Sequence, residues 1–104
     1  MIGSKVLIRS FGSGVHFGTL ENENFTAAGK VVTLSNSRRI HYWKGAASLS
    51  QIATDGIKTG RVAMILPVIE IVNVIETIPL SDMAILNLEN QHIVTGKQIG
   101  RAHV

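Results

Sequence analysis

Two segments concentrate the residues whose types and spacing could do chemistry: residues 10–18 and residues 38–51. In the first segment, Gly12, Gly14 and two serines lie between Arg9 and His16. Glycines let the backbone approach a ligand closely and leave amides free to bind phosphate. This pattern predicts ligand contacts from Arg9, Ser13 and His16. A glycine-rich hairpin turn without any ligand is the alternative, and no Gly-Lys-Ser/Thr follows, so the segment is not a Walker loop.

The second segment places two guanidiniums, two aromatic rings and a lysine before a predicted helix start. Arginine forks suit phosphates, aromatic rings can stack on a base, and free amides at a helix start bind anions. The alternative is that one ring fills the core, which the pattern favours for Tyr42, while Ser48 only caps the helix. The predicted binding residues here are Arg39, Tyr42, Trp43, Lys44, Ser48 and Ser50.

Catalytic patterns are weak. The four histidines have no metal-ligand spacing, and Glu70 and Glu76 make no obvious acid/base pair. The absence of cysteine excludes disulfides and thiolate metal sites. The sequence therefore predicts a protein that is not an enzyme and that needs no cofactor.

Composition sets the class of protein. With 104 residues, 45% of them hydrophobic and 16% charged, the chain fits one globular domain. The net charge is +3, but lysines and arginines are scattered, so we expect no DNA or RNA partner. The start of the chain has no apolar signal region, and the apolar run over 62–78 is interrupted by Pro67, Glu70, Asn73 and Glu76. We therefore expect a soluble cytoplasmic protein without membrane contact.

The elements that must position these residues are mostly strands. Alternation and turn residues predict strands over 5–10, 15–22, 30–34 and 38–43, with turns near 22–29 and 35–37. These strands would form an antiparallel meander with short connections.

Helix signals follow the meander. Ser48 and Gln51 form a capping box and Gly56 would end a short helix, while Ser81 begins a final helix over 82–88. Between them, 61–66 and 68–78 predict one or two strands, with Pro67 favouring an edge or a bulge. The predicted fold is mostly β (α+β): a small, SH3-like, partly open antiparallel barrel, or a sheet with helices on one face, with a short helix after the fourth strand and a C-terminal helix.

We predict a single β domain over residues 1–90 and a tail over 91–104. The last seven residues, 98–104, correspond to the translation of a common sequencing adapter, which we interpret as an artefact; a genuine polar tail is the alternative. Without Arg101 the net charge falls from +3 to +2, which weakens the argument from basicity further.

A longer pattern covers nearly the whole chain. It runs from about Lys5 to Leu88 and comprises Arg9, then Gly-Val-His-Phe-Gly over 14–18, then Arg-Arg-Ile-His-Tyr-Trp-Lys-Gly-Ala-Ala-Ser-Leu-Ser over 38–50, then residues 71–79. This pattern resembles a family of small tailed-phage proteins that is similar to the phage anti-CBASS sponges. The resemblance implies that the protein binds a cyclic dinucleotide immune signal, such as 3′3′-cGAMP, without cleaving it. It also implies a homo-oligomer, a dimer or tetramer, in the host bacterial cytoplasm.

A cyclic dinucleotide has two phosphates and two bases, so a two-fold interface between identical subunits would supply each contact twice. For such a ligand, Arg39 and Lys44 are predicted to hold phosphates and Tyr42 or Trp43 to stack, with polar contacts from Ser13, His16, Ser48 and Ser50. Three other functions compete: a sponge for an ADP-ribose-type signal of Thoeris defence, a protein–protein interaction module, and a nuclease or phosphodiesterase.

Overall fold

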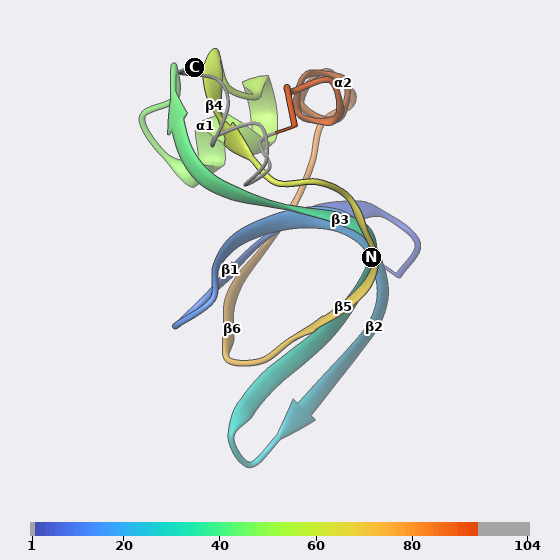
Figure 1. Ribbon diagram of the computed structural model, residues 1–104. Coiled ribbons are helices and arrows are strands. Elements are labelled where there is room, and N and C mark those ends of the chain that lie inside the picture. The colour runs from blue at the N-terminus through green and yellow to red at the C-terminus, as the bar shows by residue number, and fades with distance from the viewer. Residues whose placement is uncertain (1, 94–104) are drawn as a thin grey trace, which may run out of the picture.

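The computed structural model describes residues 2–93, which form one antiparallel sheet of six strands with two short helices (Figure 1). This confirms the predicted mostly β fold. The elements are β1 (Lys5–Ser10), β2 (Gly14–Thr26), β3 (Gly29–Lys44), α1 (Leu49–Asp55), β4 (Thr59–Val62), β5 (Leu66–Ile71), β6 (Val74–Pro79) and α2 (Asp82–Glu89).

The sheet is an open, curled one. Its order is β4-β3-β2-β1-β6, and β5 pairs with β3 along the same edge as β4, opposite β2. Only Val72 and Asn73 separate β5 from β6, although these two strands pair with β3 and β1 respectively. The strands therefore wrap into a partly open barrel that does not close (Figure 1). Pro67 lies in β5, which pairs only along its β3 side, as predicted for an edge strand.

Strands β2 and β3 are longer than the sequence predicted. The segments 30–34 and 38–43 are one continuous strand, so α1 follows the third strand rather than a fourth. The expected turn at 35–37 is instead a β-bulge, in which Asn36 takes a φ of +48°. Asparagine tolerates this left-handed conformation in bulges as well as in turns. The other expected turn, near 22–29, contracts to Ala27 and Ala28, since β2 continues to Thr26 and pairs with Gly29.

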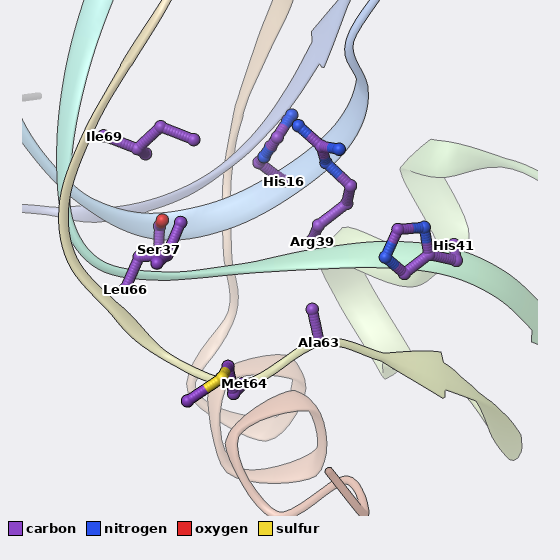
Figure 2. Close-up of a pocket in the computed structure, with 8 residues that line it drawn as sticks. All are labelled: His16, Ser37, Arg39, His41, Ala63, Met64, Leu66 and Ile69. Atoms are coloured by element: carbon purple, nitrogen blue, oxygen red, sulfur yellow. The ribbon is translucent and has the colours of Figure 1, made fainter. Parts of the chain in front are cut away.

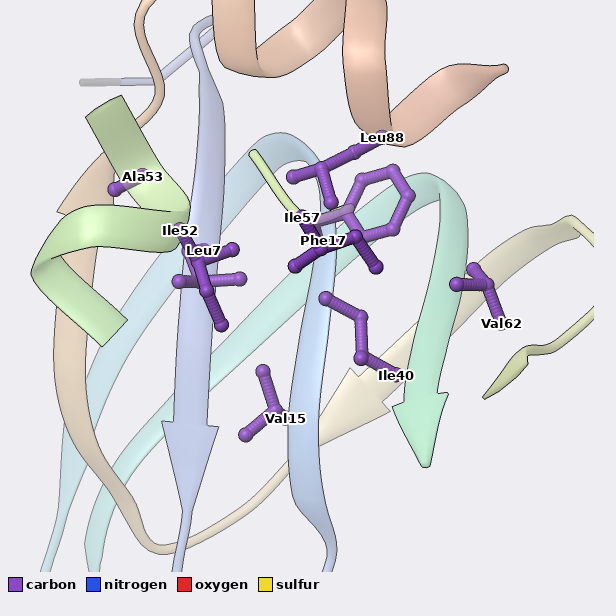
Figure 3. Packing of buried hydrophobic residues seen from close by; sticks show 9 residues of the cluster. All are labelled: Leu7, Val15, Phe17, Ile40, Ile52, Ala53, Ile57, Val62 and Leu88. Atoms are coloured by element: carbon purple, nitrogen blue, oxygen red, sulfur yellow. The ribbon is translucent and has the colours of Figure 1, made fainter. Parts of the chain in front are cut away.

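Alternation along β1 creates two separate cores. Val6 and Ile8 pack inside the curled sheet, whereas Leu7 packs on the opposite face beneath the helices (Figure 3). Each fully buried leucine or isoleucine stabilises the fold by roughly 1.5–3 kcal/mol. The barrel core comprises Val6, Ile8, Leu20, Val32, Leu34, Ile71 and Val74. The helix-side core comprises Leu7, Val15, Phe17, Ile40, Ile52, Ala53, Ile57, Val62 and Leu88.

Both helices begin at their predicted caps, and α1 also ends at its predicted glycine. The Ser48 side chain accepts a hydrogen bond from the Gln51 amide, and Gly56, with a φ of +82°, ends α1. Ser81 caps α2 by accepting from the Ala84 amide. Neither helix within residues 2–93 is long and apolar enough to cross a membrane. The interpretation of 98–104 concerns residues outside the described part of the chain.

Candidate functional site

A cavity opens where β3 changes its neighbour. Residues Val32–Ser37 of β3 pair with β5, and from Ile40 onward β3 pairs with β4. The chain crosses between these two partners over residues 63–65, and beside this crossing lies a cavity of about 220 Å³ (Figure 2). Its lining residues are His16, Ser37, Arg39, His41, Ala63, Met64, Leu66 and Ile69.

One wall of the cavity is polar and basic. Ser37, Arg39 and His41 are alternate residues of β3 and therefore share a face of the strand. His16 of β2 lies directly opposite Arg39 in the strand register. Figure 2 shows the Arg39 guanidinium beside the His16 ring. No aspartate or glutamate lines the cavity, so its charge suits an anion.

His16 is buried, with 1% of its surface exposed, and is held in one tautomer. Its Nε2 lies 3.0 Å from the carbonyl oxygen of Ser13. Because a carbonyl only accepts, Nε2 carries the proton, and Nδ1 of the neutral ring is left as an acceptor. Burial lowers the pKa of His16 most strongly, and the positive charge of Arg39 lowers it further, while the Ser13 bond opposes both and His41 adds a smaller lowering.

The other wall is apolar. Ala63 and Met64 come from the crossing between β4 and β5, and Leu66 and Ile69 come from β5 itself. Apolar side chains that face a few polar groups are typical of small-molecule sites. The arrangement can hold an anionic group against β3 and an apolar or aromatic group against β5.

The adjacent arginines of the second segment have different surroundings. Arg38 points to the opposite face from Arg39, is 2% exposed, and donates five hydrogen bonds to backbone carbonyls. Its Nε is 2.7 Å from the Ala63 oxygen, and its Nη1 is 3.0 Å from the Gln91 oxygen. Further Nη1 bonds reach the carbonyls of Leu88 and Glu89 at the end of α2. Arg38 therefore fixes α2 to the sheet.

The first segment contributes one residue to the cavity. His16 lines it directly, whereas Ser13 lies in the turn before β2 and contacts the His16 ring through its carbonyl and, at 3.4 Å, its hydroxyl. Arg9 forms an ion pair with Glu76, with 3.0 Å between Arg9 Nε and Glu76 Oε1. Its predicted ligand contact stays a prediction, because Arg9 does not line the cavity.

The aromatic pair lies outside the cavity, and the preference for Tyr42 as a core residue is wrong. His41 is an extra residue against β4, because Ile40 pairs with Val62 and Tyr42 with the next residue, Arg61. This bulge shifts the alternation, so Trp43 packs with Ile40 on the helix-side core while Tyr42 is 49% exposed. The Trp43 Nε1 donates to the Ala46 carbonyl.

The remaining predicted residues, Lys44, Ser48 and Ser50, belong to the β3–α1 region. Lys44 pairs with Thr59, and Ser48 caps α1. The backbone oxygen of Ser50 accepts from Thr54. None of the three lines the cavity, so their ligand role stays a prediction too. Of the nine predicted residues, the structure brings His16 and Arg39 together in the cavity.

Sequence reasoning missed Ser37, His41 and the whole apolar wall. The alternation of Ser37, Arg39 and His41 was a usable signal, but it was hidden by the expectation of a turn at 35–37. The apolar wall depends on which strand β5 pairs with, and no local pattern shows that pairing. Within residues 2–93, no group of three or more histidines, aspartates or glutamates is placed to hold a metal ion.

The fold and the cavity define a small domain with a curled, open antiparallel sheet and a cavity with a basic wall beside its central strand. The chain belongs to the family described as Domain of unknown function (DUF6948), whose model matches residues 3–88. The match runs from before β1 to the last turn of α2 and includes every residue of the cavity. No curated protein and no solved structure matches the chain significantly.

Proposed function

We propose that this protein is a phage immune-evasion protein that binds and sequesters a cyclic nucleotide immune signal, such as 3′3′-cGAMP, in the host bacterial cytoplasm. The observation that supports this most is the cavity, in which Arg39 and His16 of facing strands lie across from an apolar wall. A guanidinium suits a phosphate, and an apolar wall suits the face of a base. Bound signal would be withheld from the CBASS effector.

The size of the cavity supports a site shared between two copies of the chain. Its volume is about 220 Å³. This exceeds the roughly 150 Å³ that accepts a benzene molecule, but it is below the range of roughly 300–1,000 Å³ typical for a drug-sized ligand. One cavity therefore suits one nucleotide unit. A cyclic dinucleotide has two such units related by symmetry, and a two-fold dimer would offer two cavities.

Sequestration requires fewer functional groups in the site than cleavage does. Holding a signal requires affinity alone, whereas phosphodiester cleavage requires an activated nucleophile or a positioned acid and base. The Nε2 proton of His16 is committed to the Ser13 carbonyl, and no carboxylate lines the cavity. These features favour a binding protein over a phosphodiesterase.

Retention of a signal by the purified full-length chain tests the proposal. The protein is incubated with cyclic dinucleotides and with cyclic ADP-ribose signals, freed of unbound ligand and heated, and the released compound is identified by mass spectrometry. We expect intact cyclic dinucleotide from the wild type and little from Arg39→Ala. Arg61→Ala is the matched control, because Arg61 is exposed on β4 and does not line the cavity.

Each other outcome contradicts a definite part of the proposal. Release of a linear product would make the protein an enzyme. Retention of the ADP-ribose signal alone would keep sequestration and overturn the cyclic dinucleotide assignment. Retention of no ligand would favour the protein–protein interaction module.

A further inference from the structure

Ser37 carries a buried hydroxyl without a partner. The residue is 1% exposed, and its Oγ is the one buried side-chain polar atom within residues 2–93 that has no hydrogen-bond partner. Buried hydroxyls are nearly always hydrogen-bonded, because leaving one unpaired is costly. Ser37 lines the cavity, and Figure 2 shows its oxygen on the side of Ile69 and His16. The hydroxyl is therefore an unsatisfied polar group in the wall of the cavity.

The strand is built to place this hydroxyl there. Between the pairs Phe17–Arg38 and Thr19–Ser35, β3 has one residue more than β2, and Asn36 absorbs it with a φ of +48°. Bulges re-aim side chains and are frequent beside functional sites. Val32 and Leu34 are buried on one face of β3, so unbroken alternation would place residue 36 on that face and Ser37 on the opposite one. The bulge brings Ser37 to the face of Val32 and Leu34.

Gly18 gives the bulge its room. A Cβ on Gly18 would lie 2.9 Å from the Ser35 oxygen and 3.0 Å from the Ser37 Cβ. Glycine thus allows the two strands to approach closely where Ser37 turns inward. Three local features, the bulge, the glycine and the unpaired hydroxyl, converge on one position of the cavity wall.

We propose that Ser37 is a specificity-determining residue whose hydroxyl, together with the Arg39 guanidinium, holds a phosphoryl group of the ligand. Ser37 and Arg39 lie two residues apart on one face of β3, a spacing of about 6.6 Å that an arginine side chain spans. A phosphoryl group has several oxygens, so it can accept from a hydroxyl and from a guanidinium fork at once. The absence of acidic lining residues leaves the charge of that group uncontested.

The choice of phosphoryl chemistry rests on the proposed function, but the role of Ser37 has its own test. Nuclear magnetic resonance follows the Ser37 amide and the Arg39 Nε during titration of the full chain with inorganic phosphate, adenosine monophosphate and adenosine. We expect both phosphorylated probes to shift these resonances and adenosine to bind more weakly. Ser37→Ala should weaken adenosine monophosphate binding about tenfold, the loss of one charge-assisted hydrogen bond.

Stability separates a ligand contact from a structural role. Because the hydroxyl has no partner in the free protein, Ser37→Ala should be at least as stable as the wild type in urea denaturation. A merely structural hydroxyl would instead make this variant less stable. Ser35→Ala is the matched control: its hydroxyl donates to Glu21 at 2.5 Å and does not line the cavity, so probe binding should be unchanged.

Two results would overturn the inference. In the first, inorganic phosphate at tens of millimolar shifts neither the Ser37 nor the Arg39 resonance. In the second, Ser37→Ala binds adenosine monophosphate as tightly as the wild type does, which would mean that water alone satisfies the hydroxyl. Either result is distinct from failure of the proposed function. If phosphate binds through Ser37 but no immune signal is retained, the proposed function fails and the inference stands.

Discussion

Replacing Arg38 by methionine should remove a large share of the protein's stability without removing a side chain that lines the cavity. The guanidinium makes two short hydrogen bonds, 2.7 Å to the Ala63 oxygen and 3.0 Å to the Gln91 oxygen. Hydrogen bonds of a charged group contribute roughly 1.5–3 kcal/mol each, so these two amount to about 3–6 kcal/mol. Keeping the guanidinium buried costs part of that sum, since its desolvation lowers the pKa of Arg38.

We therefore expect Arg38→Met to lower the free energy of unfolding by about 3 kcal/mol, a substantial part of the 5–15 kcal/mol typical of a domain. Urea denaturation measures this loss, and Trp43, the single tryptophan, reports it by fluorescence because it packs against the helix-side core. Methionine keeps much of the apolar stem, so the loss reports mainly on the guanidinium.

Arg39→Met is the matched comparison. Arg39 is the neighbouring residue on the opposite face, and within the described residues it has no carboxylate within ion-pair distance. It should lose retention of a cyclic dinucleotide while its stability changes by less than about 0.5 kcal/mol. If Arg38→Met unfolds at the wild-type urea concentration, or if both variants are equally destabilised, the division of labour between these arginines is refuted.

The remaining predictions concern other features of the fold and the site. Since burial and Arg39 lower the pKa of His16 below its ordinary 6.5, the unfolded chain binds this proton more readily, and the free energy of unfolding falls as the pH drops through about 6.5. His16→Gln, which can still donate to Ser13, should show a smaller loss between about pH 7.5 and about pH 5.5 in urea denaturation; an equal loss would contradict the pKa assignment. Gly18→Ala places a methyl against Ser37 and should lower stability by about 1–3 kcal/mol and weaken retention of the signal, and full retention would refute the close approach. Trp43→Ala should lower the free energy of unfolding by about 2–3 kcal/mol, and an unchanged melting temperature in circular dichroism would contradict its packing role. Isothermal titration calorimetry should give a stoichiometry of one cyclic dinucleotide for two chains, and one ligand per chain would refute the shared site.

Local sequence signals predicted the parts of the fold that depend on a few adjacent residues. The caps at Ser48 and Ser81 are examples, because a cap is completed within three residues of the chain. The alternation of Val6, Leu7 and Ile8 likewise predicted a strand with two faces, and both faces are buried.

The bulges could not be predicted, because they depend on the neighbouring strand. Ser-Asn-Ser over 35–37 is equally typical of a turn and of a bulge, and pairing of both flanks with β2 decides for the bulge. The extra residue His41 depends in the same way on pairing with β4. It reverses the expected positions of Tyr42 and Trp43.

The sequence predicted only part of the cavity, because its walls also depend on which strands are neighbours. His16 and Arg39 were singled out by residue type, and the hairpin register places them opposite each other. The separate surroundings of Arg38 and Arg39 follow from alternation, but the carbonyls that Arg38 binds come from the end of β4, from Ala63 just after it and from the end of α2. From residue type alone, two adjacent arginines would be predicted to have the same role.

The crossing between β4 and β5 has a consequence for how this family can diversify. Residues 63–65 belong to neither strand. Their one backbone–backbone hydrogen bond outside the regular elements is donated by the Ala63 amide to the Arg39 carbonyl at 2.8 Å. Exposed Met64 can therefore be exchanged without breaking a strand pairing, whereas Arg39 and Ser37 are fixed within the sheet. Mutation at Met64 can therefore reshape the apolar wall of the cavity, while the polar wall that β3 forms is retained.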